Sequence, residues 1–429
     1  MRIILKDKVK KTIESLLIKN INVFDVDGSA FRKNIDVLIE NGIIKKVDKS
    51  IDEEGCETII DGSGKYAIPG LFECHGHLAV LTTEDDKKKH DLLKKFVTTG
   101  FTQVRDVGGP VKILKQMKED IDQGKLVGPE IFYSGPMLEK SPLAHGAHNE
   151  KMPEFTVAID TKEAAEKMIK KLVNYGAKLV KTFNKFDTDV FKHLFNEARK
   201  ENLPIAHDPG TPLFHQMPID KAIDIGVNCF EHGKTPLPVV LKEELQKEHD
   251  ILLAEPDPQK MMMFMGKIFK LGEDAISTEK LEKLIDKMLE NDVYFCPTMA
   301  FKASTEMHKP ERIADEQTKI AVQFIYDIGI YFTREIIKRN VKILIGQDGF
   351  DPHFTFMEMK ILNEIGLSEA EAIKGATIYP ARWLGVEKEY GSIESNKIAN
   401  ILILEKNPLD DIQNITSTNL VIYKGEIVR

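Results

Sequence analysis

The chain has 429 residues, 42% of them hydrophobic and 30% charged, which suits a globular protein with a large core and excludes a disordered or collagen-like chain. Its formal net charge of −8 argues against the basic surface of a general nucleic-acid binder. Its four cysteines have no CxxC spacing, no apolar stretch is long enough to span a membrane, and the first residues lack the pattern of a signal peptide. We expect a cytoplasmic protein that binds neither nucleic acid nor membranes.

Both ends of the chain are rich in predicted strands. Residues 16–64 contain β-branched runs separated by turn residues, and Asn41-Gly42 between two apolar runs predicts a two-residue hairpin. Residues 399–408 and 419–429 have the same character, with a turn expected at Lys424-Gly425. We therefore expect the two ends to assemble one small β domain.

The middle of the chain alternates apolar, strand-like runs with helical patterns. Helices are predicted at 162–175, 277–291 and 321–339. The strand-like runs lie at 66–77, 101–107, 130–135, 178–183, 203–208, 229–233, 293–298 and 342–348. Eight strands alternating with helices predict an α/β fold, namely a (β/α)₈ TIM barrel over residues 67–385. Residues 1–66 plus 386–429 are then expected to form a composite β-sandwich domain.

The first pair of chemically informative residues is His75-Gly76-His77, at the end of the first predicted barrel strand. Residues two apart on a strand point to the same face, so both imidazoles can converge on one metal ion. Two ordinary polar residues at a strand end are the alternative for this motif taken alone.

Lys181 ends the strand-like run at 178–183 and is expected to point into the barrel mouth. Burial disfavours the ammonium form of a lysine. The neutral amine can react with CO₂ to give a carbamate, which can bridge two metal ions. A lysine that extends to solvent is the more common explanation for a single such residue.

Three more strand ends carry residues of metal-ligand type, namely His207, His232 and Asp348. Taken singly, each histidine is more often structural, and an aspartate after a strand is more often a helix cap. However, five separate strands end in such residues, and the carboxyl ends of barrel strands open on one face. Coincidence at all five is improbable, so the set predicts a site for two divalent ions.

The order His-X-His, Lys, His, His, Asp on successive strands resembles the amidohydrolase superfamily, and the resemblance covers nearly the whole chain. The segments PGLFECHGH, GFTQVRDVGG, FEHG, FCPT, ATIYPARWLG and GSIESNKIANILILEKNPL carry it. Within that superfamily, the sequence is most similar to the group of imidazolonepropionases and metal-dependent dipeptidases of the prolidase and Xaa-Arg/Lys type. The family's barrel with a β-sandwich from both termini agrees with the organisation inferred above.

The resemblance implies a role for each of these residues. His75 and His77 bind the more buried ion, a carboxylated Lys181 bridges, His207 and His232 bind the second ion, and Asp348 completes the site. Asp348 is also the expected proton acceptor and donor in catalysis. The ions are expected to be zinc, with Mn, Fe or Co as alternatives.

The sequence departs from the family pattern directly after His207, the third histidine of the predicted ligand set. The family commonly has His-Ala-His-Gly where this chain has His207-Asp208-Pro209-Gly210. The substituted second histidine is not a ligand in the family's usual assignment, so the expected ligand set is retained.

Three further features bear on the substrate. The family resemblance implies that His145, in the loop SPLAHGAHNE, contacts the substrate, with a solvent-exposed loop histidine as the alternative. The methionine-rich segment Met261–Met265 predicts either a lid over the barrel mouth or a helix packed on the core. Arg105 is expected to pair with Asp106 rather than to act in the site.

The leading functional prediction is a hydrolase that cleaves an amide or peptide C–N bond, as a dipeptidase or related amidase. A cyclic-amide hydrolase of the imidazolonepropionase type and a mononuclear deaminase-like enzyme are alternatives, although such deaminases usually lack the bridging lysine. A non-catalytic scaffold of this fold and a β-rich binding protein are less favoured, because all six ligand positions are retained and the barrel pattern is clear. A small amide or dipeptide is the expected substrate, and a homo-oligomer the expected assembly.

Overall fold

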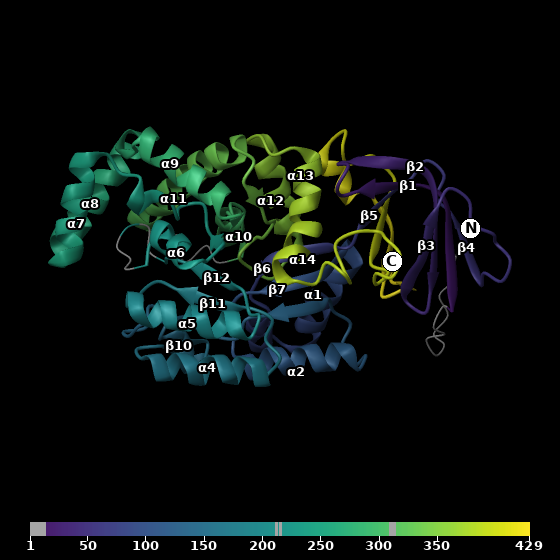
Figure 1. Cartoon of the computed structure of the whole chain (residues 1–429), viewed down its shortest axis with the longest axis horizontal. Helices are drawn as coiled ribbons and strands as arrows, with labels where there is room; N and C mark the ends of the chain where they lie inside the picture. The colour runs from purple at the N-terminus through teal and green to yellow at the C-terminus, as the bar shows by residue number, and fades with distance from the viewer. Residues whose placement is uncertain (1–13, 211–212, 214–216, 309–314) are drawn as a thin grey trace.

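The computed structural model describes residues 14–210, 213, 217–308 and 315–429. Within these residues, parallel strands form the centre of the molecule and helices surround them (Figure 1). A second sheet, built from both ends of the chain, lies at one end of the long axis, and helices α7 and α8 lie at the other (Figure 1).

The parallel strands form two hydrogen-bonded groups, ordered β6-β7-β8 and β10-β9-β11-β12-β13-β14-β15. Each of the eight strand-like runs predicted from the sequence contains one of these strands. Their bounds are β6 (Leu71–Gly76), β7 (Phe101–Asp106), β8 (Glu130–Tyr133), β11 (Val180–Phe183), β12 (Ile205–Asp208), β13 (Cys229–Glu231), β14 (Tyr294–Cys296) and β15 (Lys342–Ile343). Two short strands that were not predicted, β9 (Met137–Glu139) and β10 (Thr156–Ala158), join the larger group.

Backbone hydrogen bonds connect the two groups at both edges of the smaller one. On one side, the amide of Cys74 in β6 donates to the carbonyl of Ile345, just after β15, at 2.9 Å. On the other side, the amide of Lys178, just before β11, donates to the carbonyl of Tyr133 in β8 at 3.0 Å. Because the pairing is parallel throughout, the carboxyl ends of these strands gather on one side of the molecule.

The helices pack one apolar face against the strands, as their sequence periodicity requires. Helix α4, for example, is capped by the Thr161 side chain and buries Ala165, Met168, Ile169 and Leu172, which are spaced three or four residues apart. The helices are α1 (Asp86–Thr99), α2 (Val111–Asp122), α3 (His148–Lys151), α4 (Lys162–Asn174), α5 (Thr188–Lys200), α6 (Ile219–Ile225), α7 (Glu243–Ala254), α8 (Pro258–Leu271), α9 (Thr278–Glu290), α10 (Phe301–His308), α11 (Glu316–Lys338), α12 (Pro352–Glu364), α13 (Glu369–Gly375) and α14 (Ile378–Leu384).

The second sheet joins strands from both ends of the chain, in the order β18-β17-β16-β5-β1-β2-β3, with β4 paired to β1. Its strands are β1 (Ser15–Asp25), β2 (Ala30–Glu40), β3 (Ile43–Asp48), β4 (Thr58–Asp61), β5 (Tyr66–Pro69), β16 (Ile401–Leu404), β17 (Thr418–Tyr423) and β18 (Glu426–Ile427). The antiparallel pairing of β16 with β5 connects the two ends directly. A separate cluster of buried side chains, including Leu16, Val37 and Ile401, belongs to this sheet.

The predicted hairpin turns are present in this sheet. Asn41 and Gly42 have φ values of 49° and 79° and connect the antiparallel strands β2 and β3. Lys424 and Gly425, at 50° and 81°, connect β17 and β18 in the same way. In the described part of the chain, no helix has the length and apolar character needed to cross a membrane.

Candidate active site

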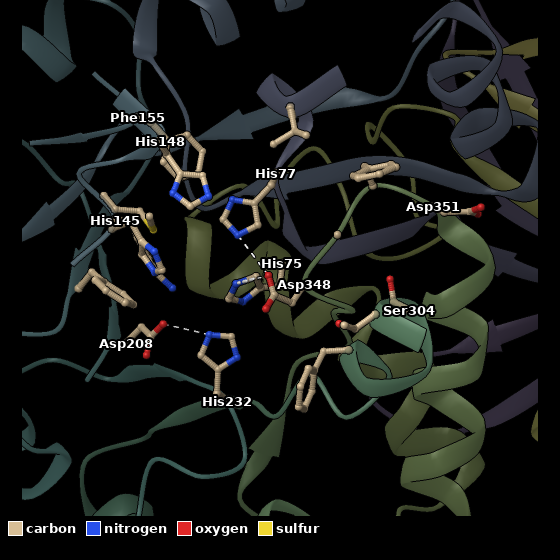
Figure 2. Close-up of a pocket in the computed structure, with 18 residues that line it drawn as sticks. His75, His77, His145, His148, Phe155, Asp208, His232, Ser304, Asp348 and Asp351 are labelled. Atoms are coloured by element: carbon tan, nitrogen blue, oxygen red, sulfur yellow. Dashed lines mark ion pairs between the residues drawn. The ribbon is translucent and has the colours of Figure 1, made fainter. Parts of the chain in front are cut away.

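A cavity of about 410 Å³ lies where the parallel strands end, and most of the predicted ligands line it (Figure 2). These are His75, His77, Lys181, His232 and Asp348. Asp208 also lines the cavity, whereas His207 does not. We call His75, His77 and Asp348 the first ligand group, and Lys181, Asp208 and His232 the second ligand group.

In the first ligand group, two imidazoles converge on one carboxylate. The Nε2 atom of His77 lies 3.3 Å from Oδ1 of Asp348, and Nε2 of His75 lies 3.7 Å from the same oxygen (Figure 2). Asp348 follows β15 with a φ of 59°, a left-handed conformation that a non-glycine residue adopts uncommonly. The other nitrogen of each ring is engaged elsewhere, since Nδ1 of His77 lies 3.0 Å from the carbonyl oxygen of Gly108.

A buried ion pair supports His75 from the side away from the cavity. Nδ1 of His75 lies 2.6 Å from Glu231, whose carboxylate also accepts a hydrogen bond of 2.8 Å from Arg105. Both charged side chains are fully buried. Arg105 therefore pairs with Glu231, and not with Asp106 as expected from the sequence. Asp106 instead accepts hydrogen bonds from the backbone amides of Leu78 and Gly108.

In the second ligand group, both ring nitrogens of His232 contact polar side chains. Its Nδ1 atom lies 2.7 Å from the hydroxyl of Thr298, and its Nε2 atom lies 3.0 Å from Oδ2 of Asp208 (Figure 2). Lys181 is 1% exposed, and its Nζ atom is buried without a hydrogen-bond partner in the structure. A buried, unpartnered amine is costly, so this atom calls for a group that can bind it.

His207 is outside the cavity, which corrects the expectation that it binds a metal ion there. Its Nδ1 atom lies 2.8 Å from the hydroxyl of Thr182, and its Nε2 atom lies 2.8 Å from the carbonyl oxygen of Met217. The ring is fully buried between Phe191 and Phe230. With both nitrogens engaged, His207 has no ligand atom available to the cavity.

The protonation states of His75 and Asp348 suit metal binding, whereas the pKa of His77 is raised, because the lowering effect of burial is outweighed by the hydrogen bond to Asp348 and the charges of nearby carboxylates. Burial lowers the pKa of His75 to about 3, against the opposing effect of Glu231, so its imidazole is neutral at physiological pH. Burial acts to raise the pKa of Asp348, but the hydrogen bond and charge of His77 outweigh it, so the pKa lies well below its usual range and the carboxyl is ionised. Neutral imidazole and ionised carboxylate are the forms that bind metal ions.

Two buried carboxyl groups brace the backbone under the ligands. Glu73 accepts hydrogen bonds from the amides of His75 and Gln347, and burial raises its pKa to about 7. Glu358 accepts from the amide of Ala300, near the Thr298 hydroxyl that holds His232, and burial raises its pKa to about 8. The backbone next to each ligand group is therefore hydrogen-bonded to a buried carboxyl group whose pKa is raised.

The outer walls of the cavity combine aromatic and polar side chains. Phe155, Phe183, Phe301 and Phe350 contribute aromatic rings, and His145 lies against Phe183 with 4.8 Å between ring centroids. A second lobe of about 240 Å³ shares His145, Asp208, His232 and Asp348 with the main cavity and adds Lys234. His145 is thus placed where a substrate could contact it.

The methionine-rich segment contributes nothing to either lobe. It forms helix α8, which buries Phe264 and Ile268, whereas Met262 and Met263 are 67% and 75% exposed. Neither lobe is lined by a residue of this helix. In this structure the segment is therefore not a lid over the cavity.

The side chains at this site fit bound metal ions. Metal-binding histidines usually place one ring nitrogen on a carboxylate, carbonyl or hydroxyl group and present the other to the ion, as His75, His77 and His232 do here. Two ligand atoms on one four-coordinate ion, with bonds of about 2.0–2.1 Å, lie about 3.3 Å apart. The 3.3 Å contact of His77 with Asp348 matches that spacing, and the 3.0 Å contact of His232 with Asp208 is slightly shorter.

Two features of the site escaped the sequence reasoning. Asp208 was read only as a departure from the family pattern, although it stands two residues after Ala206 on a strand whose alternate side chains face inward. No role is predicted from the sequence for Glu231, which lies in the segment FEHG. Its signal was its place next to His232, on the face of the strand opposite Phe230.

The chain is similar to known proteins over most of its length. Residues 245–428 match the amidohydrolase family model. A dihydroorotase of Ruminiclostridium cellulolyticum is 26% identical over 91% of this chain and 89% of its own length. A 5-methylthioadenosine/S-adenosylhomocysteine deaminase of Caldanaerobacter subterraneus subsp. tengcongensis is 23% identical over 92% and 85%. Residues 245–428 thus resemble the amidohydrolase family, and these similarities together support an enzyme that acts on carbon–nitrogen bonds.

Solved structures share the fold over nearly the whole chain. A crystal structure of a Xaa-Pro dipeptidase with bound methionine has a TM-score of 0.72 at 20% identity, covering 96% of this chain and 99% of that one. The ochratoxinase of A. niger has a TM-score of 0.73 at 18% identity, covering 98% and 96%. At these identities the similarity establishes the α/β fold and not the substrate.

Proposed function

We propose that this protein is a binuclear metal-dependent hydrolase that cleaves an amide or peptide C–N bond, as a dipeptidase or related amidase. The observation that carries the proposal is the arrangement of three imidazoles, each held at Nδ1 and directed at Nε2 toward a carboxylate of the cavity, beside the unpartnered Nζ of Lys181. A carboxylated Lys181 would satisfy its nitrogen and supply two oxygen ligands.

The proposal includes the organisation of the chain. A closed (β/α)₈ barrel over residues 67–385 would carry the site, and a β-sandwich of residues 1–66 and 386–429 would form the second domain. The hydrogen bonds between β6 and residue Ile345, and between β8 and Lys178, support closure of the barrel.

The chain's own residues would handle the protons of the reaction. Two divalent ions, held by His75, His77, Lys181, His232 and Asp348, would supply a water molecule of lowered pKa and polarisation of the scissile carbonyl group. Asp348 is placed to accept the proton from the attacking water through its carboxylate and to return it to the leaving nitrogen. His145, on the far side of the cavity, would contact the substrate near its scissile bond.

The position of Lys234 in the second lobe supports the proposal that the substrate has a carboxylate group. Among the described residues that line the two lobes, Lys234 and Lys181 are the only lysines, and Lys181 is assigned to the metal site. The lobe next to Lys234 is otherwise formed largely by apolar residues such as Pro297, Met299 and Ile325. An apolar residue with a free carboxylate, as in a dipeptide or an N-acyl amino acid, fits this combination.

The test begins with the metal content of the purified protein, measured by elemental analysis after reconstitution with Zn²⁺ or Mn²⁺. Two ions per chain, together with hydrolysis of N-acyl amino acids and dipeptides in preference to their C-terminal amides, would support the proposal. Ring opening of dihydroorotate-like cyclic amides would favour the alternative suggested by the dihydroorotase relative. Release of ammonia from purine nucleosides by a protein with one ion would instead make it a deaminase.

A further inference from the structure

We propose that Asp208, and not His207, is the metal ligand that strand β12 contributes. This inference rests on the proposed binuclear function and changes the chemistry of its second site, because an anionic carboxylate takes the place of a neutral imidazole.

The register of the strands determines which side chains face the cavity. Strand β12 pairs in parallel with β11, so that Ala206 lies opposite Lys181, His207 opposite Thr182, and Asp208 opposite Phe183. Lys181 and Phe183 both line the cavity. Since side chains alternate between the faces of a strand, Asp208 shares the cavity face and His207 lies on the opposite face with Thr182.

His207 is also fixed in place by its contacts. The hydroxyl of Thr182 and the carbonyl oxygen of Met217 each lie 2.8 Å from one of its ring nitrogens. To bring this ring into the cavity, β12 would have to shift by one residue, which would move every one of its side chains to the other face. It would also leave a buried hydroxyl and a buried carbonyl group without their partners.

Asp208 has the properties that a ligand at this position needs. Its side chain is only 4% exposed, yet it lines both lobes of the cavity. The backbone amide of Gly210 donates to Oδ1 at 2.7 Å and orients the carboxylate. The remaining oxygen, Oδ2, lies 3.0 Å from Nε2 of His232, as two ligand atoms on one ion would.

The exchange of imidazole for carboxylate adds a negative charge to the second ligand group. Oxygen ligands suit Mn²⁺ and similar hard ions better than imidazole does, whereas imidazole suits Zn²⁺. We therefore expect this chain to bind Mn²⁺ at its second site more readily, relative to Zn²⁺, than a site with a histidine would.

The test compares Asp208→Asn with His207→Asn, two neighbouring substitutions on opposite faces of one strand. The measurements are metal ions per chain, by elemental analysis, and the affinity of the weaker ion, by competition with a chromophoric chelator. In Asp208→Asn we expect the second ion to be lost or its affinity to fall about 10-fold or more, because a charged ligand is replaced by a weak neutral one. In His207→Asn we expect two ions to be retained at nearly unchanged affinity in the folded fraction.

A third variant, Asp208→His, keeps the test decisive if either asparagine variant folds poorly. It restores an imidazole on the cavity face, so we expect two ions and a shift in preference from Mn²⁺ toward Zn²⁺. A merely structural role of Asp208 would not produce that shift.

The outcomes separate the two proposals. If the unmodified protein binds two ions and Asp208→Asn binds them equally well, the ligand assignment is overturned and the proposed function stands. Loss of one ion in folded His207→Asn would likewise overturn the assignment. If the unmodified protein binds no divalent ion, the proposed function fails, and the ligand assignment fails with it.

Discussion

The two ligand groups of the cavity lie side by side but are built in different ways. In the first, His75 and His77 come from one strand end, and their alignment depends only on alternation within that strand. In the second, Lys181, Asp208 and His232 come from three strands, and their alignment depends on the register between those strands. His75 is supported by a buried ion pair, whereas Lys181 has no partner for its Nζ atom.

The two groups also differ in whether their buried polar atoms have partners. The first group satisfies its charges internally, through Glu231 on one side and Asp348 on the other. In the second group, the Nζ atom of Lys181 is buried without a hydrogen-bond partner, which a carbamate would change. The following predictions are ordered from the largest expected effect to the smallest.

The largest effect is expected at Asp348, which touches both histidines of the first ligand group. Asp348→Asn should lower kcat by about 10²–10⁴-fold, because the general base and acid is lost. The control is Asp351→Asn, since this neighbouring carboxylate lines the cavity but pairs with Lys95 at 2.7 Å. Steady-state hydrolysis of the preferred substrate measures both, and equal losses in the two variants would contradict the role of Asp348.

The next effect concerns the ion pair beneath His75. Glu231→Gln should weaken metal binding by about 10–100-fold, because groups that hold a metal-binding histidine have effects of that size. It should also lower the free energy of unfolding by about 3–5 kcal/mol, since Arg105 is left buried without its carboxylate.

Glu73→Gln is the matched control for this variant. Glu73 lies on the other side of His75, where it contacts the backbone amide and not the ring. Chelator competition and urea unfolding give the two readouts. If Glu73→Gln weakened metal binding as much as Glu231→Gln did, support of the ring by Glu231 would not be the cause.

Sequence reasoning reached the first ligand group because the information is local. The spacing of His75 and His77, the turn at Asn41-Gly42 and the eight strand segments are each set by a few adjacent residues. It failed at β12 because which of two adjacent residues faces the cavity is set by pairing with β11, a relation between distant segments. It also missed the pairing of Arg105 with Glu231, since these residues are 126 positions apart.

The third prediction concerns the two buried carboxyl groups that brace the ligand groups. The pKa of each is raised from 4.5 by burial, to about 7 for Glu73 and about 8 for Glu358. The folded protein therefore holds protons that the unfolded chain releases above about pH 4.5. The contribution of these groups to stability is fully present below that pH and is lost as the pH rises through 7 and then 8.

Urea midpoints between pH 5 and pH 9 measure this effect. Each group should steepen the fall by up to about 1.4 kcal/mol per pH unit within its own range. Glu358→Gln, which keeps an acceptor for the amide of Ala300, should remove a component of the fall that extends from about pH 4.5 to about pH 8, and Glu73→Gln should remove one that ends near pH 7. Unfolding profiles with the same slope in all three proteins would show that neither carboxyl group is held protonated.

The smallest effect is expected at the methionines of α8, which belong to neither ligand group. Met262 and Met263 are largely exposed and line neither lobe, so Met262→Ser with Met263→Ser should leave KM and kcat unchanged. Substitutions at exposed positions change stability by less than about 0.5 kcal/mol in most cases. Phe301→Ala is the contrasting variant, because Phe301 lines both lobes. The KM of this variant should rise. A rise in KM in the double methionine variant would mean that α8 moves over the cavity when substrate binds, and that the apolar wall of the site extends beyond its four phenylalanines.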